Sequence, residues 1–254
     1  MNYIILDIEF NGRKFASELP MEVIEIGAVR LDERLEAVDE FHAVIKPVYF
    51  SKLNTFIKKK TGIAQEEIDS AAGFKKVIAE FIDWLKQSEE LLLFTWGGED
   101  LKRIVLDTRM HKLDDSFWMQ IEYFDLLKGY IRYQNVTNDV SVEAALQELG
   151  IAPEGSAHRA LDDARMTAHI LRAIHDKLDL AHKQHYKDQF TNAKERRMIK
   201  TAIRTLTAQK LALSWELLHE RYLAGKDAFT DPRKLAELRV CYDNEIAKAK
   251  QPRH

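Results

Sequence analysis

The order in which strand and helix patterns follow one another restricts this chain to few folds. Three apolar or alternating segments come first, at residues 3–8 (YIILDI), 22–31 (EVIEIGAVRL) and 37–46 (AVDEFHAVIK), and we expect them to form an antiparallel meander. Two further strands are predicted at 91–96 and 118–126, with helical segments around them. Three strands followed by such alternation predict an α/β fold in which helices cover both faces of a mixed five-stranded sheet.

Helical periodicity accounts for most of the remaining chain. Apolar residues recur every three or four positions between residues 74 and 86, which is typical of a helix with one buried face. No strand pattern follows Leu178. There we expect one long helix at 192–223 and a second that begins after Asp231-Pro232, together forming a helical hairpin. Further helices are predicted at 54–60, 65–70, 99–110, 141–149 and 160–177.

Charge is distributed unevenly along the chain. Residues 178–254 contain 16 Lys and Arg against 10 Asp and Glu, whereas residues 1–177 contain 22 against 31, so the net charges are +6 and −9. We therefore predict two domains: 1–177, which carries the chemistry, and 178–254, a basic helical extension. An acidic domain that binds nucleic acid needs metal ions or a basic neighbour to attract phosphate.

Several features bear on the compartment. No segment approaches the roughly 18 consecutive apolar residues of a membrane span, so no membrane association is expected. The first ten residues, MNYIILDIEF, lack the basic and then apolar pattern of a secretory signal. Cys241 is the only cysteine, which excludes an internal disulfide and fits a reducing compartment. We expect a cytoplasmic protein.

Asp7 and Glu9 occupy alternate positions of the first apolar strand, so both side chains leave the same face. Two carboxylates on one face of a central strand are costly to desolvate, and a divalent cation would remove that cost. The alternative is a strand end that emerges into solvent, where both carboxylates are harmless. The D-x-E pattern alone does not decide between these interpretations.

Asp100, in TWGGED, follows the fourth predicted strand and lies in the first turn of a helix. An acidic residue there can simply interact favourably with the helix dipole. At the carboxyl end of a strand it also points to the edge where open α/β sheets bind ligands. Glu99 is an alternative for the same role.

Helical periodicity distinguishes two adjacent aspartates in the segment HRALDDA. Asp162 falls on a polar stripe and is predicted to face solvent, whereas Asp163 falls with Ala160 on the edge that faces the core. A carboxylate in that position needs a partner, which a metal ion would supply. His158 lies just before the helix. A loop histidine is commonly a solvated side chain, but beside a metal cluster it is a candidate base because its ordinary pKa is near neutrality.

Taken in order, these motifs resemble the DEDDh 3′-to-5′ exonucleases. The resemblance rests on D-x-E near the start, P-x-E-V-I-E-I-G-A-V, T-G-I at 61–63, T-W-G-x-x-D and H-x-A-x-x-D, and it covers residues 1 to about 175. The segments T-W-G-x-x-D and G-x-x-H-R-A-L-D-D-A are closer to the Eri-type branch, which trims RNA 3′ ends, than to the proofreading branch. The layout is also similar to that of Bacillus-type sporulation regulators in this branch.

The resemblance implies an RNase H-like fold with a site for two divalent ions. Mg²⁺ or Mn²⁺ is expected, because hard cations prefer oxygen ligands. His158 is implied as the general base, and Glu9 is counted with it as catalytic. The implied metal ligands are Asp7, Glu9, Asp100 and Asp163.

The resemblance also implies substrate contacts. Phe10, with Glu9, is expected near the sugar of the last nucleotide, and Phe56 is expected to stack on the terminal base. Core packing of Phe56 is an equally weighted alternative. Asn11 stands where the family often has Thr, which puts the hydrogen bonding around the terminal sugar in doubt.

The predicted function is 3′-to-5′ hydrolysis of single-stranded nucleic acid, with RNA preferred to DNA and nucleoside 5′-monophosphates released. A DNA exonuclease of repair or proofreading is the first alternative. A catalytically weak nucleic-acid-binding regulator is the second.

Two hypotheses concern the extension at 178–254. A basic run at the start of its long helix could hold the nucleic-acid strand. Apolar residues of the same helix could instead pack against the second helix or another chain, giving a homodimer. The basic residues are Lys194, Arg196, Arg197, Lys200 and Arg204, and the apolar ones are Ile199, Ile203, Leu206, Leu213 and Leu217.

Overall fold

The structure is a computed structural model that describes residues 1–11, 21–153 and 155–250. The chain divides into two compact units, Met1–Tyr186 and Lys187–His254. Each unit has its own apolar core. Within the described residues, no helix is both long and apolar enough to cross a bilayer.

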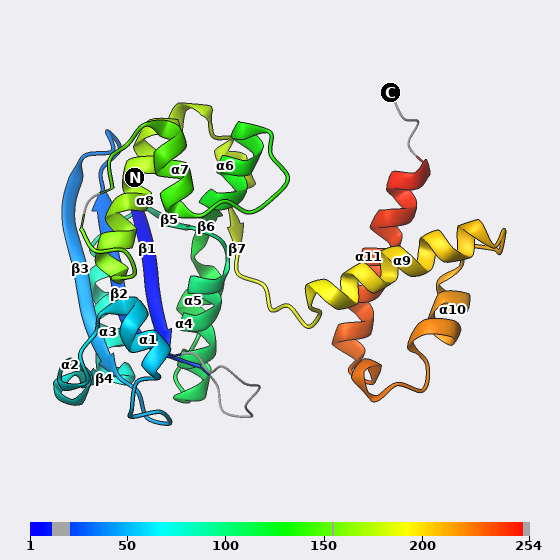
Figure 1. The fold of residues 1–254 in the computed structure, drawn as a ribbon, viewed down its shortest axis with the longest axis horizontal. Helices are drawn as coiled ribbons and strands as arrows, with labels where there is room; N and C mark the ends of the chain where they lie inside the picture. The colour runs from blue at the N-terminus through cyan, green and yellow to red at the C-terminus, as the bar shows by residue number, and fades with distance from the viewer. Residues whose placement is uncertain (12–20, 154, 251–254) are drawn as a thin grey trace. The chain divides into compact units, whose positions relative to one another are not determined.

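One mixed sheet organises the first unit, as predicted (Figure 1). Its strand order is β4-β3-β2-β1-β5-β6-β7. The β1–β2 and β2–β3 pairs are antiparallel and form the expected meander, whereas β5 and β6 continue the sheet parallel to β1. The strands are β1 (Asn2–Asn11), β2 (Glu22–Leu31), β3 (Ala37–Lys46), β4 (Ala72–Gly73), β5 (Leu91–Thr95), β6 (Glu122–Asp125) and β7 (Gln184–His185).

Two details of the sheet differ from expectation. The two-residue strands β4 and β7 lie at its edges and were not predicted. Residues 118–120, expected as strand, belong instead to helix α5 (Ser116–Gln120), and β6 begins only at Glu122. Trp118 of this helix is fully buried. A short apolar run that ends up buried has no periodicity by which strand and helix can be told apart.

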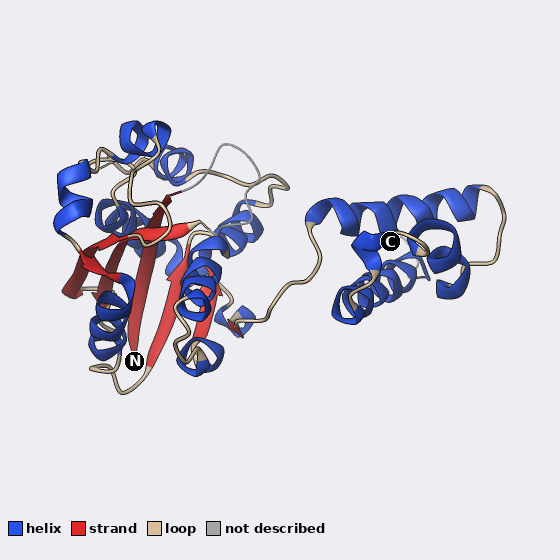
Figure 2. Cartoon of the chain, turned by 90° about the horizontal axis from the view of Figure 1, so that it is seen from below, coloured by secondary structure: helices blue, strands red, loops and turns tan. Residues whose placement is uncertain are grey.

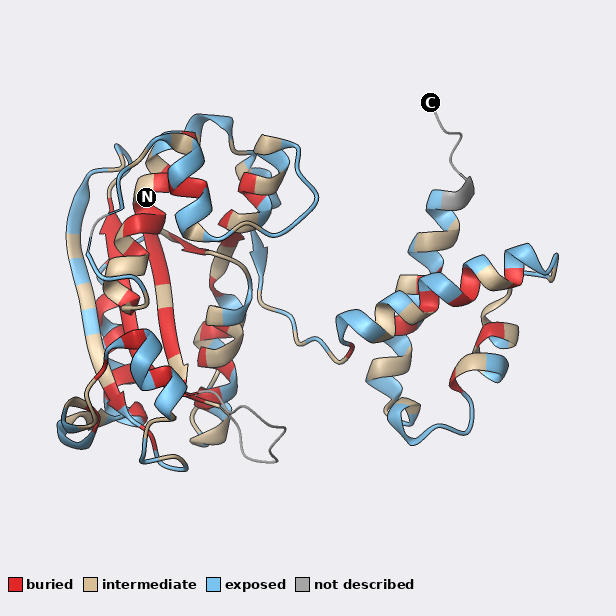
Figure 3. Ribbon diagram, in the orientation of Figure 1, coloured by how far each residue is buried: buried red, intermediate tan, exposed pale blue. Residues whose placement is uncertain are grey.

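Helices cover both faces of the sheet (Figure 2). Along β1, even-numbered residues such as Ile4 and Leu6 pack with α3, α4 and α5, while odd-numbered Tyr3 and Ile5 pack with α6, α7 and α8. Both faces of β1 and β2 are therefore largely buried (Figure 3). The bounds are α3 (Phe74–Leu85), α4 (Glu99–Met110), α6 (Leu126–Gln134), α7 (Val142–Leu149) and α8 (Ala160–Ile174).

Three local features complete the unit. Helices α1 (Thr55–Thr61) and α2 (Gln65–Ser70) cover a small core around Ile24 of β2. Two 3₁₀ turns, η1 (His175–Lys177) and η2 (Leu180–His182), lead from α8 to β7. Gly27 lets α8 lie directly on β2, because a Cβ at this position would come within 2.1 Å of the Leu161 backbone nitrogen.

The second unit is helical, but the single helix expected at 192–223 is wrong. The chain forms α9 (Ala193–Ala208), turns at Lys210 with φ 55°, and resumes with α10 (Trp215–Leu218) and the π-helical turn η3 (His219–Leu223). Leu206 and Leu218 belong to one small core, yet a continuous helix would separate them by about 18 Å. The predicted second helix is present as α11 (Pro232–Lys250), after the 3₁₀ turn η4 (Asp227–Phe229).

Candidate metal-dependent active site

Strand β1 presents Asp7 and Glu9 at the end that β5 does not cover. Its parallel pairing with β5 stops at Ile5, opposite Phe94, whereas its antiparallel pairing with β2 continues past Asp7 and Glu9. Both carboxylates lie on the face of the sheet that α8 covers, because they share the side of Tyr3 and Ile5. Glu9 is buried, so the alternative of a strand end in open solvent does not hold for it.

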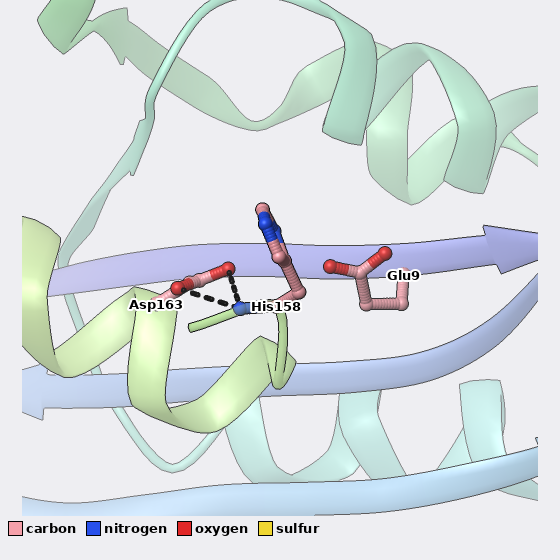
Figure 4. Close-up of side chains that lie close together, drawn as sticks. All are labelled: Glu9, His158 and Asp163. Carbon is pink, nitrogen blue, oxygen red and sulfur yellow. Dashed lines mark hydrogen bonds between the residues drawn. The ribbon is translucent and has the colours of Figure 1, made fainter. Parts of the chain in front are cut away.

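Helix α8 brings Asp163 to this face of β1. The Asp163 carboxylate accepts hydrogen bonds from the backbone N–H of His158, at 3.1 and 3.3 Å. His158 has a left-handed backbone, with φ 68°. Ligand atoms of Glu9, His158 and Asp163 all lie within 4.8 Å of one another (Figure 4). Residues far apart in the chain thus form one compact group of oxygen and nitrogen donors.

Asp7 and Asp100 join this group through their charges. Burial raises the pKa of Asp7 well above its ordinary value, and the charges of Asp100, Asp163 and Glu9 raise it further. Burial also raises the pKa of Asp100 to about 8, against the lowering effect of hydrogen bonds from its own backbone N–H and that of Ile8. Asp100 is in the first turn of α4, beside Glu99, whose carboxylate is paired with Lys102 and Arg103 instead.

The other two carboxylates are similarly perturbed. Burial raises the pKa of Glu9 to about 7, and that of Asp163 to about 6. Four carboxylates of like charge, one buried and three half-buried, repel one another unless they are protonated or neutralised by a cation. A donor set made of carboxylate oxygens fits a hard divalent cation such as Mg²⁺ or Mn²⁺. The residues present therefore fit the ions that the sequence resemblance implied.

His158 is set up differently from the carboxylates. Burial lowers its pKa below the ordinary value, Lys60 lowers it further, and Glu143 opposes the shift. The imidazole is therefore neutral at neutral pH and can accept a proton.

Sequence reasoning overlooked Glu25, which is fully buried on β2 and pairs with Glu9 in the register. Its carboxylate accepts from Arg159 Nε at 2.9 Å, from the Ala160 backbone N–H at 3.0 Å and from His42 Nε2 at 2.7 Å. Burial opposes its ionisation, but these hydrogen bonds lower the pKa of Glu25 below its ordinary value. Glu25 is thus an ionised anchor for the N-terminus of α8. Glu25 and Arg159 lie within the motifs E-I-G and H-R-A, but nothing in the sequence indicates that they meet.

Lys60, on α1, was also overlooked. It is exposed, and its positive charge lowers the pKa values of Glu9, Asp163 and His158. Lys60 is therefore a positively charged side chain whose charge acts on three of the predicted site residues. A lysine in an exposed helical run has no distinguishing pattern in the sequence.

The predicted substrate contacts have distinct environments. Phe56 is 69% exposed on α1, which is incompatible with core packing. Phe10 is half-buried, with the Arg103 guanidinium 5.2 Å from its ring centre. Asn11 is buried, and its amide is used by the loop before α1: it donates to Phe50 and accepts from the Asn54 backbone N–H.

Asp162 is less exposed than predicted. Its side chain is 21% exposed, and its carboxylate accepts from the Ser156 backbone N–H at 2.8 Å and from Arg165 at 3.0 Å. Gly155 lies against this carboxylate as well. Asp162 therefore holds the loop that precedes α8, while its neighbour Asp163 points to Glu9 and His158.

Comparison with known proteins agrees with this geometry. A model of the exonuclease family of RNase T matches residues 4–171. The mouse (Mus musculus) 3′-5′ exoribonuclease 1 is 27% identical over 173 residues, which covers 65% of this chain and 50% of that protein. The probable 3′-5′ exonuclease KapD of Bacillus subtilis is 27% identical over 175 residues, covering 66% of this chain and 81% of KapD. This chain thus spans about half the length of the mammalian relative it matches.

The fold is similar to that of solved nuclease structures. The crystal structure of the nuclease domain of 3′hExo, a DEDDh family member bound to rAMP, superposes with a TM-score of 0.65 and 24% identity. The superposition covers 74% of this chain and 97% of that domain. The family match includes Asp7, Glu9, Asp100, His158 and Asp163 and stops before the second unit. This chain therefore belongs to the exonuclease family.

Proposed function

We propose that this protein is a metal-dependent 3′-to-5′ exonuclease that acts on single-stranded RNA and releases nucleoside 5′-monophosphates. One observation carries the proposal: donor atoms of Glu9, His158 and Asp163 lie within 4.8 Å of one another, at the face where Asp7 and Asp100 add two more carboxylates. RNA is favoured over DNA because the mouse relative is named an exoribonuclease.

The four carboxylates of Asp7, Glu9, Asp100 and Asp163 would hold the divalent ions. When bound, such ions supply positive charge against the phosphate oxygens and against the leaving 3′ oxygen. Because these carboxylates have raised pKa values, the metal-free site holds protons that ion binding must displace. Affinity for metal should therefore rise with pH.

His158 is assigned as the general base. Its neutral imidazole accepts a proton from the attacking water as the new P–O bond forms and the bond from phosphorus to the 3′ oxygen breaks. The leaving 3′ oxygen takes a proton from solvent, so the products are a nucleoside 5′-monophosphate and a strand shortened by one residue. Asp163 holds the backbone of His158 in place through the two hydrogen bonds to its N–H.

Phe56 and Phe10 are assigned to the terminal nucleotide. An aromatic ring that is 69% exposed offers a stacking surface that accepts any base, which suits stepwise trimming. The Asn11 amide is engaged by the loop at 50–54, so in this chain Asn11 positions α1 and does not supply a free sugar contact.

A degradation assay tests the proposal. A 5′-labelled single-stranded RNA and a DNA of the same sequence are incubated with Mn²⁺ or Mg²⁺, with and without EDTA. We expect a ladder that shortens from the 3′ end, release of 5′-monophosphates, faster cleavage of RNA, and no activity in EDTA. A circular RNA, which has no 3′ end, is the control and should stay intact. Cleavage of the circle, or full activity in EDTA, would contradict the mechanism.

A further inference from the structure

The second unit contains a groove of about 830 Å³ between α9 and α11. Its lining includes the small or apolar side chains of Ala193, Ala236 and Val240, all of them exposed. Val240 is 59% exposed. The basic side chains that line the groove come from both helices. Helix α9 contributes Arg196, Arg197 and Lys200, and α11 contributes Lys248.

The apolar face of α9 does not line this groove. Ile199, Ile203 and Leu206 are at most 7% exposed, because they pack inside the unit with Leu218, Leu238 and Tyr242. The residues that could have formed a dimer contact are therefore mostly used by the unit's own core. The groove therefore presents basic side chains and a few exposed apolar ones to a partner.

The basic side chains that line the groove outnumber the acidic ones by four to two, so the groove has a net positive charge. Arg197 is exposed and has no acidic partner among the residues the structure describes. Lys200 and Lys248 share one carboxylate, that of Glu245, at 3.3 and 3.2 Å. The other acidic residue of the groove, Glu237, accepts hydrogen bonds from the backbone of Phe190 and Thr191. Arg196 donates to the Thr191 carbonyl and keeps its charge.

We propose that this groove binds the phosphate backbone of single-stranded nucleic acid, as a binding site additional to the carboxylate site. Guanidinium and ammonium groups from two helices are suited to phosphate oxygens, and the exposed apolar side chains between them can contact a sugar or base. Charge complementarity calls for an anionic occupant, and nucleic acid is chosen over an acidic protein because the substrate of the proposed reaction is itself a polyanion. The choice of nucleic acid rests on the proposed function.

The charge of the whole chain supports a division of labour. Residues 187–254 carry 15 Lys and Arg against 9 Asp and Glu, whereas residues 1–186 carry 23 against 32. A catalytic unit with net charge −9 repels a polyanion over distances comparable to the Debye length, about 10 Å in moderate salt. A basic groove on the same chain keeps the strand at a high local concentration without contributing to the chemistry.

Binding of a labelled oligouridylate to the full chain tests the groove directly. EDTA is present, so that no hydrolysis occurs, and affinity is measured by anisotropy at several salt concentrations. For Arg197→Ala/Lys200→Ala we expect weaker binding. The slope of log affinity against log salt concentration should be smaller in magnitude by about 1.4, because each phosphate contact in a single strand contributes roughly 0.7 to it. Lys210→Ala/Arg221→Ala removes the same charge from exposed positions outside the groove and should leave the slope unchanged.

Cys241 provides a second readout. It is the only cysteine of the chain, it is half-buried, and it lines the groove. Saturating oligouridylate should slow its alkylation by iodoacetamide several-fold in the wild type and in the control variant, and less in Arg197→Ala/Lys200→Ala. An alkylation rate that RNA does not change at saturation would overturn the proposal. Protection by polyglutamate without protection by RNA would overturn it too, because the groove would then be a protein-binding site.

The two proposals can fail separately. Hydrolysis of the p-nitrophenyl ester of thymidine 5′-monophosphate, with Mn²⁺, measures the chemistry on a small substrate that has no further phosphates for the groove to bind. If the wild type does not hydrolyse this ester but RNA still protects Cys241, the exonuclease assignment fails and the groove stands. If the ester is hydrolysed and the salt slope of Arg197→Ala/Lys200→Ala equals that of the wild type, the groove assignment fails alone.

Discussion

The carboxylate of Glu25 is bound by the guanidinium of Arg159, at 2.9 Å to Nε and 2.8 Å to the terminal nitrogen. This pair joins the middle of the sheet to the first turn of α8, since the Ala160 backbone N–H donates to the same carboxylate. Asp163 lies one turn further along α8. The pair therefore sets the position of the helix that brings Asp163 to Glu9.

Glu25→Gln should lower both stability and turnover. The variant leaves Arg159, which is 26% exposed, with a neutral acceptor, and we expect a loss of about 1–3 kcal/mol in the free energy of unfolding. Glu40→Gln is the matched control, because Glu40 also joins a strand to an arginine of α8, Arg165, but at the surface. Glu40→Gln should lower the free energy of unfolding by less than about 1 kcal/mol. Equal losses in urea denaturation would show that the buried pair has no special role.

The metal-free protein should become less stable as pH rises from about 6.5 to 8. In this window Glu9 and Asp100, with pKa values of about 7 and 8, bind protons in the folded state that the unfolded state has already released at ordinary values of 4.5 and 3.8. The unfolded state binds fewer protons, so the free energy of unfolding falls with pH. His158 has a lowered pKa and acts in the opposite direction only below about 6.5.

The melting temperature in EDTA, measured across this window, checks the prediction. Asp100→Asn removes one of the raised titrations and should flatten the dependence. Saturating Mn²⁺ should reverse its sign, because the ion binds the deprotonated carboxylates. A melting temperature that rises with pH in EDTA is the contrary outcome.

The two adjacent aspartates should respond differently to substitution. Asp163→Asn is expected to reduce turnover by several orders of magnitude, because it removes a carboxylate from the group with Glu9 and His158. Asp162→Asn should keep turnover within a few-fold but lower the free energy of unfolding by about 1 kcal/mol, since its carboxylate binds Ser156 and Arg165. Single-turnover kinetics and urea denaturation separate the two effects, and the reverse ranking would refute the assignment.

His158→Ala should reduce turnover by roughly 10²–10⁴-fold, the usual contribution of a general base. Affinity for Mn²⁺, measured by calorimetry, should stay close to that of the wild type, and added imidazole should restore part of the activity. Because the His158 ring is near enough to Glu9 and Asp163 to serve as a ligand, loss of Mn²⁺ binding in this variant would make it a ligand and not the base.

Phe56→Ala should leave stability within about 0.5 kcal/mol of the wild type, because the side chain is 69% exposed. If the ring stacks on the terminal base, KM for an oligonucleotide should rise by roughly 5- to 150-fold, equivalent to about 1–3 kcal/mol. Phe56→Trp should retain a low KM. Tyr133→Ala, at another exposed aromatic position, is the control and should leave KM unchanged.

Local periodicity was enough to determine much of this protein. The alternation along β1 puts Asp7 and Glu9 on one face, and the helical spacing in α8 separates Asp163 from Asp162. Both follow from backbone geometry, which repeats every two residues in a strand and every 3.6 in a helix. The order of strands and helices likewise predicted the mixed sheet, since few arrangements bury the apolar face of every element.

Only the tertiary structure decided which distant groups meet. Arg159 is hydrogen-bonded to Glu25, which lies 134 residues away in the sequence, and Asn11 is hydrogen-bonded to Phe50, 39 residues away. Neither pairing follows from any pattern local to those residues. The break after α9 was missed for the same reason: residues 192–223 have a helical pattern, but burial of Leu206 and Leu218 in one small core with Leu238 of α11 requires the chain to turn back. Packing of segments far apart in the chain outweighs a local preference of a few tenths of a kcal/mol per residue, roughly the range of helix propensities.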